Sequence, residues 1–362
     1  MIIKSIELKD FRNYESLNLQ FNEKVNLILG NNAQGKTNLI EAISITSLGK
    51  SFRTSKDYEM IKFGKEFCRV KINALKDKED IEVEIAIANN AKAIKIDGIK
   101  AKKTSELLKN IYVVIFSPED LKIVKDEPEK RRRFIDRELC QIKPSYYVNL
   151  SSYKKALIQR NFMLKEKIVD RNLLSVWDDE IIKYGSAIII QRDEFVSKIN
   201  DISKKIHSDI TGGNEILNIT YESNIKKSKD LKEQQEIFRK ELEKNIDNDI
   251  RNRTTGKGPH KDDLKLEIEK IDLRHYGSQG QQRTAALSLK LAQISLIKEE
   301  TGEYPVLLLD DVMSELDKSR QKYIINSFEN IQLFITTTDV AADVKKAFPE
   351  GKIFYVENGV VL

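Results

Sequence analysis

The strongest constraint on this chain is the segment at residues 30–37, which reads Gly30-Asn31-Asn32-Ala33-Gln34-Gly35-Lys36-Thr37. It fits the pattern G-x-x-x-x-G-K-[ST] at every fixed position. A short apolar run at residues 25–29 precedes it, and an amphipathic helical pattern follows from Thr37. In this order of strand, loop and helix, glycines let the backbone turn until successive N–H groups face one anion. The segment therefore predicts a phosphate-binding loop in an α/β domain, and we call residues 30–37 the phosphate loop.

The positions of the phosphate loop have separate expected roles. Lys36 is expected to pair with the β- and γ-phosphates of a nucleotide, and the Thr37 hydroxyl is expected to ligate Mg²⁺. The helix that follows directs its positive end toward the same anion. A chance match in a glycine-containing turn is the alternative, and the presence of both strand and helix argues against it. The remaining nucleotide contacts are expected from Gly30, Asn31, Asn32, Ala33, Gln34, Gly35 and Asn38.

Two acids follow a second apolar run. Residues 306–309 read as a buried strand, and Asp310 and Asp311 come directly after it. Asp310 is expected to hold Mg²⁺ and its water shell, and Asp311 to orient or activate the attacking water. The alternative is an ordinary strand followed by a solvated Asp-Asp turn. The phosphate loop favours the catalytic interpretation, in which Lys36, Asp310 and Asp311 are catalytic residues.

A second glycine-containing segment precedes a clear helical pattern and reads Tyr276-Gly277-Ser278-Gln279-Gly280-Gln281-Gln282-Arg283. We call residues 276–283 the second glycine segment. Ser278, Gly280 and Gln281 at a helix start would make a second anion site. Because the phosphate loop already serves one site, the segment is expected to act on the γ-phosphate held by a partner subunit, with Ser278 as a catalytic residue. The alternative is a helix start that Ser278 merely caps.

The chain has 362 residues, enough for two domains or for one domain with an insertion. Strand patterns fill residues 1–120 and return late, whereas residues 121–252 show long helical stretches rich in Lys, Glu, Ile and Leu. Apolar strands that alternate with helices favour a largely parallel sheet covered on both faces. We therefore expect an α/β lobe made of residues 1–120 and 253–362, interrupted by an inserted helical lobe at residues 121–252.

The composition excludes several other classes of protein. The two cysteines, Cys68 and Cys140, cannot form a disulfide framework or a four-cysteine zinc site. No apolar run approaches the roughly 20 residues that span a bilayer, so we expect a cytoplasmic protein without a membrane partner. The net charge of +5 permits nucleic-acid binding but does not establish it.

The phosphate loop, the second glycine segment and the acidic strand end stand in this order, and Ser314-Glu315-Leu316-Asp317 follows. This arrangement resembles the ABC-type ATPase heads of the SMC kind and, more narrowly, the bacterial RecF family of DNA repair proteins. The segments that carry the narrower resemblance span nearly the whole chain and are residues 8–14, 50–54, 116–121, 131–136, 258–264 and 276–283.

The resemblance implies a fold and a function. The fold would combine a mixed, largely parallel sheet, an antiparallel β subdomain and a helical lobe in place of a long coiled coil. With ATP and Mg²⁺ the chain would form a homodimer that sandwiches two nucleotides and hydrolyses ATP slowly under stimulation by DNA. It would bind DNA at gaps or duplex–single-strand junctions in repair and replication-fork maintenance, with RecR and RecO as partners in loading RecA.

The resemblance also carries residue roles to matching positions. Thr37 and Asp310 would be the magnesium ligands, and residues 314–317 would lie in a loop at the dimer interface. Arg12 and Asn13 match a segment that reaches the nucleotide in SMC-like heads. The contacts to the partner's γ-phosphate would come from Ser278, Gly280 and Gln281. One departure is Asp311, where such heads have glutamate; the shorter carboxylate fits slow turnover.

A basic run, Lys130-Arg131-Arg132-Arg133, opens the expected helical lobe. With Arg53, which is expected to contact nucleotide or DNA, these residues are the candidates for DNA binding. Contacts of this kind go to phosphates, so they are sensitive to salt and poor in base specificity. The alternative is a solvated helix start of mixed charge, because Asp126, Glu127 and Glu129 lie close by.

Two functions of other classes share some of these motifs. An ATPase subunit of a membrane transporter has all three, but it predicts a short segment between them, and the large basic helical region argues against it. A small-molecule P-loop kinase would act as a monomer and needs no second glycine segment.

Overall fold

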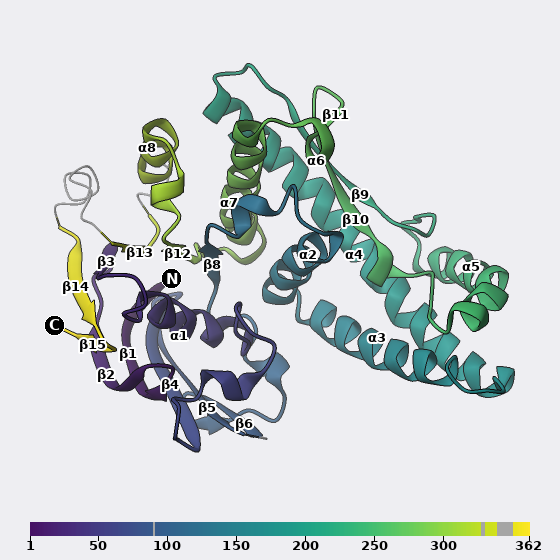
Figure 1. Cartoon of the computed structure of the whole chain (residues 1–362), viewed down its shortest axis with the longest axis horizontal. Coiled ribbons are helices and arrows are strands. Elements are labelled where there is room, and N and C mark those ends of the chain that lie inside the picture. Colours follow the sequence, from purple (N-terminus) through teal and green to yellow (C-terminus); the bar gives the residue numbers. More distant parts are fainter. Residues whose placement is uncertain (90, 327–329, 339–349) are drawn as a thin grey trace. The chain divides into compact units, whose positions relative to one another are not determined.

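The computed structural model describes residues 1–89, 91–326, 330–338 and 350–362 (Figure 1). It divides into two compact units. Residues 1–121 and 293–362 form the first, which we call the sheet unit. Residues 122–292 form the second, which we call the helical unit.

The late boundary of the helical unit differs from the expected position after residue 252, because residues 253–292 belong to this unit. Its sheet has the order β11-β10-β9, with β9 at Leu217–Glu222, β10 at Asp263–Ile268 and β11 at Ile271–Asp272. The antiparallel bonds between β9 and β10 join residues that lie on either side of position 252. The chain from residue 263 onward is therefore tied to the helices that precede it.

The sheet unit contains a six-stranded sheet of order β15-β14-β3-β13-β12-β8. Its strands are β3 (Val25–Leu29), β8 (Val113–Phe116), β12 (Val306–Asp310), β13 (Leu333–Thr337), β14 (Lys352–Glu357) and β15 (Val360–Val361). All neighbours are parallel except the β14–β15 hairpin. Strands β3, β8 and β12 are buried throughout, as expected for a parallel sheet with both faces covered. Because parallel strands end at one edge, the phosphate loop after β3 and the acids that end β12 meet there.

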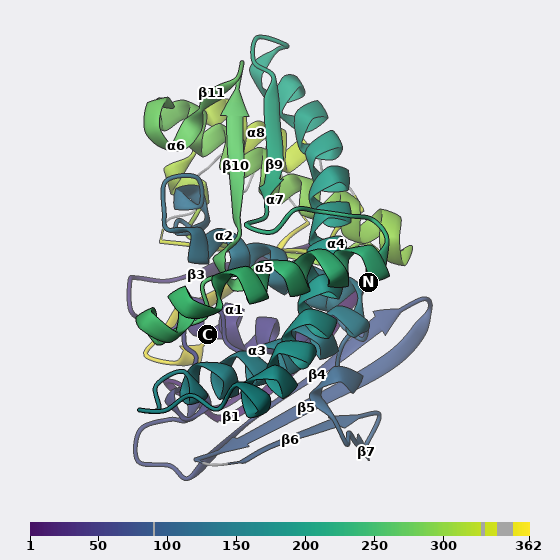
Figure 2. The ribbon, with the colours of Figure 1, turned by 90° about the vertical axis from the view of Figure 1, so that its right-hand side faces the viewer.

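A second six-stranded sheet in the same unit is antiparallel and has the order β2-β1-β4-β5-β6-β7. Its strands are β1 (Ile2–Phe11), β2 (Tyr14–Gln20), β4 (Phe67–Lys76), β5 (Glu79–Ala88), β6 (Ala91–Ile96) and β7 (Ile99–Lys100). Figure 2 shows β4, β5 and β6 side by side. Alternate residues of β4 are buried, because one face of this sheet packs on the core.

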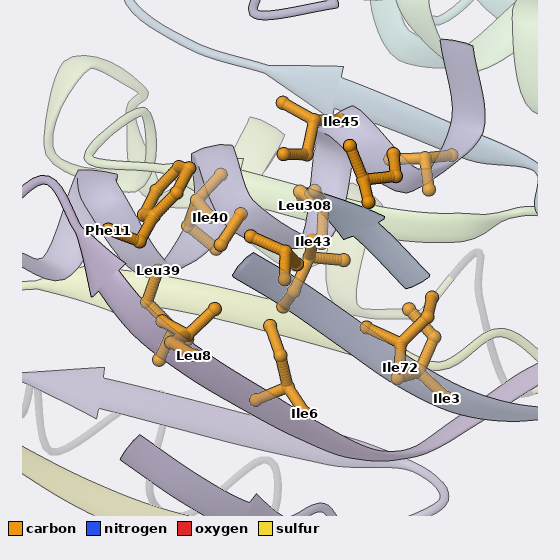
Figure 3. Close-up of a cluster of buried hydrophobic side chains, with 14 of the residues drawn as sticks. Ile3, Ile6, Leu8, Phe11, Leu39, Ile40, Ile43, Ile45, Ile72 and Leu308 are labelled. Atoms are coloured by element: carbon orange, nitrogen blue, oxygen red, sulfur yellow. The ribbon is translucent and has the colours of Figure 1, made fainter. Parts of the chain in front are cut away.

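Helix α1 (Lys36–Leu48) packs into the core of the sheet unit. Residues 39–47 are all buried, so α1 is enclosed on nearly every side and not amphipathic as the sequence pattern predicts. Figure 3 shows side chains of α1 among those of β1, β4 and β12. The labelled residues are Ile3, Ile6, Leu8, Phe11, Leu39, Ile40, Ile43, Ile45, Ile72 and Leu308. This packing fixes the helix that receives the end of the phosphate loop.

The helical unit contains α2 (Pro128–Ile142), α3 (Pro144–Met163), α4 (Arg171–Thr211), α5 (Leu231–Asn252) and α6 (Leu273–Tyr276). Side chains of Asp170 and Asp230 cap α4 and α5 at their starts. Helix α7 (Gln279–Thr301) begins in this unit and ends in the sheet unit, which also holds α8 (Lys318–Asn326). Short 3₁₀ turns occur at Asp57–Met60, Thr104–Glu106, Asp120–Lys122, Pro259–Lys261 and Met313–Glu315. Within the described ranges, none of the helices combines the length and apolar character needed to cross a bilayer.

Candidate active site

The phosphate loop requires glycine at two of its positions. Gly30 and Gly35 have φ angles of 154° and 122°, in the region that side chains disfavour. An added Cβ on Gly30 would lie 2.3 Å from the carbonyl oxygen of Val356, and one on Gly35 would lie 2.6 Å from Asn13 Nδ2. Close packing therefore enforces the tight turn that the motif predicts, and it leaves residues 31–33 exposed at the tip.

The β14–β15 hairpin and β1–β2 turn hold this loop through Gln34. Gly359 N donates to the Gln34 carbonyl oxygen at 3.0 Å, and Asn358 N donates to Gln34 Oε1 at 2.6 Å. Asn13 Nδ2 donates to the same carbonyl at 2.8 Å. Gln34 thus joins segments from both ends of the chain.

Lys36 and the start of α1 supply positive charge to the loop. The Lys36 ammonium is nearly buried and donates to the carbonyl oxygens of Gly30 at 2.7 Å and Asn31 at 3.1 Å. No described side chain caps the start of α1, and its first turn carries no acid. The N–H groups of that turn and the ammonium therefore face the space enclosed by the loop, where a phosphate would bind.

Three side chains meet where β12 and β13 end. Thr37 Oγ1 donates to Asp310 Oδ1 at 3.0 Å, and Thr336 Oγ1 donates to the same atom at 2.9 Å. Burial raises the pKa of the Asp310 carboxyl, and the two hydroxyl bonds oppose part of that rise. The structure thus brings together the two residues that the sequence predicts as magnesium ligands.

These oxygen atoms fit a magnesium ion. Mg²⁺ prefers hard oxygen ligands, keeps several waters, and often takes only one or two protein groups beside nucleotide phosphates. Thr37 and Asp310 present a hydroxyl and a carboxylate oxygen next to the phosphate loop. Over the described part of the chain, no three His, Cys, Asp or Glu side chains cluster as a separate metal site.

Thr336 lies outside the set of residues expected from the sequence. It pairs with Asp310 in the parallel register of β12 and β13. Its hydroxyl also accepts from Asp311 N at 2.9 Å, so one oxygen atom fixes both acids. Asp311 has a left-handed φ of 51°, and its carbonyl oxygen accepts from Ser314 Oγ at 2.9 Å. In a parallel sheet the residue that pairs with Asp310 lies at the same edge, but the register that pairs Thr336 with it is seen only in the structure.

Asn13 and Asn38 support the loop through their side chains. Asn38 Nδ2 donates to Asn13 Oδ1 at 2.7 Å, and Arg53 Nη1 donates to Asn38 Oδ1 at 2.7 Å. With the bond from Asn13 to Gln34, these contacts run from the phosphate loop to Arg53. Nucleotide contact by Asn13 and Asn38 stays a prediction, and their observed role is to brace the loop.

Glu41 is a second residue that the sequence pattern does not reveal. It is fully buried on α1, and its two carboxylate oxygens accept from Arg12 Nη2 at 2.7 Å and Arg12 Nε at 2.8 Å. Arg53 Nη1 lies 3.2 Å from Glu41 Oε2, and Ser51 Oγ donates to Oε1. An acid within the apolar run of residues 39–45 would have been the signal. Contact of Arg12 and Arg53 with nucleotide or DNA stays a prediction.

The second glycine segment forms a reciprocal cap at the start of α7. Gln281 N donates to Ser278 Oγ at 3.2 Å, and Ser278 N donates to Gln281 Oε1 at 3.0 Å. The capped helix start expected as the alternative is therefore present. Ser278 and Gly280 are also exposed. A Cβ on Gly280 would come no closer to the described chain than 3.9 Å, to Ser278 Oγ, so internal packing does not require glycine there.

Members of the basic run at the start of α2 differ in burial. Arg131 is 1% exposed, and its guanidinium donates to the two carboxylate oxygens of Asp263 at 2.6 and 2.9 Å. The prediction that Arg131 contacts DNA is therefore wrong, because the side chain is enclosed and its donors are used within the helical unit. Arg132 is half-buried and donates to the Asp262 carbonyl oxygen at 2.7 Å.

Lys130 and Arg133 are the exposed members of the run. They form ion pairs with Asp126 at 3.9 Å and with Glu129 at 2.5 Å. Exposed pairs of this kind contribute little free energy and exchange readily for another anion. DNA contact by Lys130, Arg132 and Arg133 stays a prediction.

Comparisons with known proteins find relatives along the whole chain. The family described as RecF/RecN/SMC N terminal domain matches residues 2–361. The DNA replication and repair protein RecF of Clostridioides difficile strain 630 is 48% identical, covering 100% of this chain and 98% of its own. The protein of the same name from Clostridium tetani strain Massachusetts / E88 is 47% identical, covering 99% of each chain.

Solved structures give the same result. The structure of the recombination mediator protein RecF-ATPrS in the RecFOR pathway superimposes with a TM-score of 0.93 at 40% identity, covering 99% of this chain and 97% of that one. A Pyrococcus furiosus Smc head domain has a TM-score of 0.55 at 18% identity, covering 99% and 95%. The second likeness shows the fold alone, which is the ABC-type ATPase head.

Proposed function

Because this chain belongs to the RecF family of DNA replication and repair proteins, we propose that it is an ATP-dependent DNA-binding protein whose two copies close around two nucleotides. ATP binding forms the homodimer on DNA at gaps or duplex–single-strand junctions. Slow ATP hydrolysis, stimulated by DNA, opens it again. The alternatives of a transporter subunit or a small-molecule kinase are set aside, because the RecF relatives match along the whole chain.

Each ATP site of the proposed dimer is a composite site, made of the phosphate loop of one copy and the second glycine segment of the other. The exposed start of α7 is the observation that supports this arrangement. A Cβ on Gly280 would meet only Ser278 Oγ, at 3.9 Å, and Ser278 is exposed. Glycine at an exposed helix start permits a ligand to approach the backbone N–H groups closely. The partner's γ-phosphate is the ligand that we assign to Ser278, Gly280 and Gln281.

The sheet unit supplies the other half of each site. The N–H groups of the phosphate loop and Lys36 hold the β- and γ-phosphates and stabilise the charge that develops during phosphoryl transfer. Thr37 and Asp310 would hold Mg²⁺, which supplies charge neutralisation between these phosphates. Asp311 orients the attacking water. As its carboxylate is one methylene shorter than that of glutamate, it reaches less far, which is consistent with slow hydrolysis.

DNA is bound through phosphates by exposed and half-buried basic residues. Lys130, Arg132 and Arg133 on α2 are the candidates in the helical unit, and Arg53 is the candidate in the sheet unit. The bound dimer recruits RecR and RecO and so promotes loading of RecA. DNA as the ligand places this activity in the bacterial cytoplasm.

Dilution tests the composite site directly. Each site is completed by another copy of the chain, so the rate of ATP hydrolysis per subunit should fall as the protein is diluted. Light scattering should give a monomer without nucleotide and a dimer with ATP and DNA. A rate per subunit that stays constant through dilution, with a monomer in all conditions, would exclude the proposal.

A substitution in the phosphate loop tests the assignment of the chemistry. Lys36→Arg should retain nucleotide binding and abolish turnover, because guanidinium cannot replace a compact ammonium inside the loop. Lys24→Arg is the matched control, since the Lys24 side chain is 73% exposed. Parental turnover by Lys36→Arg would place catalysis elsewhere.

A further inference from the structure

Glu215 connects the second glycine segment to a buried histidine. It follows the Gly212–Gly213 turn after α4. Its Oε1 accepts from Gln281 Nε2 at 2.9 Å, and its Oε2 lies 3.1 Å from His207 Nε2. Because Gln281 Oε1 accepts from Ser278 N, both ends of the Gln281 amide are held.

The other side of this connection returns to α7. His207 is fully buried, and its Nδ1 lies 3.1 Å from Ser288 Oγ. Ser288 Oγ donates to the Thr284 carbonyl oxygen at 2.8 Å, and Thr284 Oγ1 donates to the Gly280 carbonyl oxygen at 2.8 Å. The contacts therefore form a closed ring that begins and ends in the first turns of α7. All of its members lie in the helical unit.

The ring determines how the Gln281 side chain is oriented. A carboxylate that accepts from an amide N–H makes a stronger bond than a neutral acceptor does. With Nε2 directed to Glu215, the Gln281 Oε1 atom can point only toward the Ser278 N–H that it caps. Without Glu215 the side chain would regain other rotamers, and the cap would form for only part of the time.

We propose that Glu215 is a positioning residue for the composite ATP site. It fixes Gln281, and through Gln281 it holds the Ser278 hydroxyl and the first N–H groups of α7 in the orientation that meets the partner's γ-phosphate. Glu215 itself touches no nucleotide. This inference rests on the proposed function, because it concerns the half-site that one copy lends to the other.

Substitution of Glu215 should separate dimer formation from nucleotide binding. In Glu215→Ala, affinity for a fluorescent ATP analogue should stay at the parental value, because the phosphate loop is intact. ATP-dependent dimerisation, measured by light scattering, should weaken about tenfold, which is the effect of losing one hydrogen bond to a charged group. Glu215→Gln should restore dimerisation, since its amide oxygen can accept from Gln281. Asp209→Ala, an exposed acid of α4, is the control for the change in charge.

Two results of this measurement would overturn the inference. The first is that Glu215→Ala dimerises at the same protein concentration as the parent. Equal losses of nucleotide affinity, dimerisation and thermal stability are the second, because they indicate a general defect of folding. If Glu215→Ala does not fold, Glu215→Asp keeps the charge, shortens the side chain by one methylene and is measured in its place with the same expected result.

Mixed dimers show whether Glu215→Ala impairs the ATP site of its own subunit or that of its partner. Lys36→Ala removes the phosphate-loop half of a site, whereas Glu215→Ala is expected to impair only the half that is lent to the partner. Each variant alone should hydrolyse ATP poorly. An equal mixture should recover up to about a quarter of the parental rate, because random pairing of symmetric chains leaves one complete site in each mixed dimer. No recovery would mean that Glu215 acts on its own subunit's nucleotide.

A parallel mixture distinguishes this failure from failure of the proposed function. Ser278→Arg blocks the second glycine segment directly, and its mixture with Lys36→Ala should recover activity to the same level. Recovery with Ser278→Arg but not with Glu215→Ala would reject the role of Glu215 alone. No recovery in either mixture would reject the composite site itself.

Discussion

Replacement of Arg131 should destabilise the protein without weakening its contacts to DNA phosphates. Arg131→Met keeps most of the aliphatic stem and removes the guanidinium. That group bonds both oxygens of Asp263, and its Nη1 donates to the carbonyl oxygens of Ile123, Val124 and Asp126. Breaking a buried ion pair by removing one partner costs about 3–5 kcal/mol. Because Asp263 is 22% exposed and water can reach it, we expect the lower end, about 3 kcal/mol.

Urea unfolding followed by tryptophan fluorescence measures this loss. The only tryptophan is Trp177, which lies on α4 in the same unit as Arg131. Arg133→Met is the matched control: its side chain is 71% exposed, so the free energy of unfolding should change by less than about 0.5 kcal/mol. If Arg133 contacts a phosphate, its replacement should reduce the salt dependence of DNA binding by about one ion. Parental stability together with a reduced salt dependence for Arg131→Met would refute the structural role.

Three further predictions concern buried groups. Burial raises the pKa of Asp310, which means that its ionised form opposes folding at neutral pH; Asp310→Asn should therefore raise the free energy of unfolding while lowering ATP hydrolysis about a hundredfold. Burial lowers the pKa of His260 to about 4, so as the pH falls the unfolded state binds a proton before the folded state does. The free energy of unfolding should therefore fall by about 3 kcal/mol between pH 6.5 and pH 4. A His260→Gln variant with the same pH profile would contradict this. Gly258 has φ 135°, and a Cβ there would lie 2.3 Å from the Tyr153 hydroxyl. Gly258→Ala should therefore lower the free energy of unfolding in urea by about 2 kcal/mol. Gly213→Ala is the control, because Gly213 also has a positive φ but open space around its Cα.

The parts of the site that the sequence predicts are local in the chain. The phosphate loop has its strand, glycines, lysine and helix within consecutive residues, and Asp310 follows directly on a buried strand. The parts that the sequence does not predict depend on distant pairing. Thr336 joins the site through the parallel register of β12 and β13, and Glu41 on α1 joins it through Arg12 of the β1–β2 turn. The spacing of apolar residues along the chain does not indicate contacts of this kind.

The two corrections have a related cause. Four consecutive basic residues look alike in a sequence, but the turn of α2 exposes Arg133 and encloses Arg131 against Asp263. The sequence predicts the end of the helical region at residue 252, where the helical pattern stops. The true boundary lies later, because β9 and β10 lie far apart in the chain and pair only in the fold. The alternation of buried Leu217, Ile219 and Tyr221 was a local sign of β9 that the helical interpretation passed over.

The contacts around Gln34 join segments from both ends of the chain, so the phosphate loop has all of its neighbours only late in synthesis. Strand β3 pairs with β13 and β14, and the loop after it contacts Val356 and Gly359. A ribosome must therefore translate past residue 359 before these neighbours emerge, although the antiparallel hairpins of the first hundred residues need no such delay. If nucleotide joins two copies as proposed, polypeptides still in synthesis on neighbouring ribosomes should not yet pair.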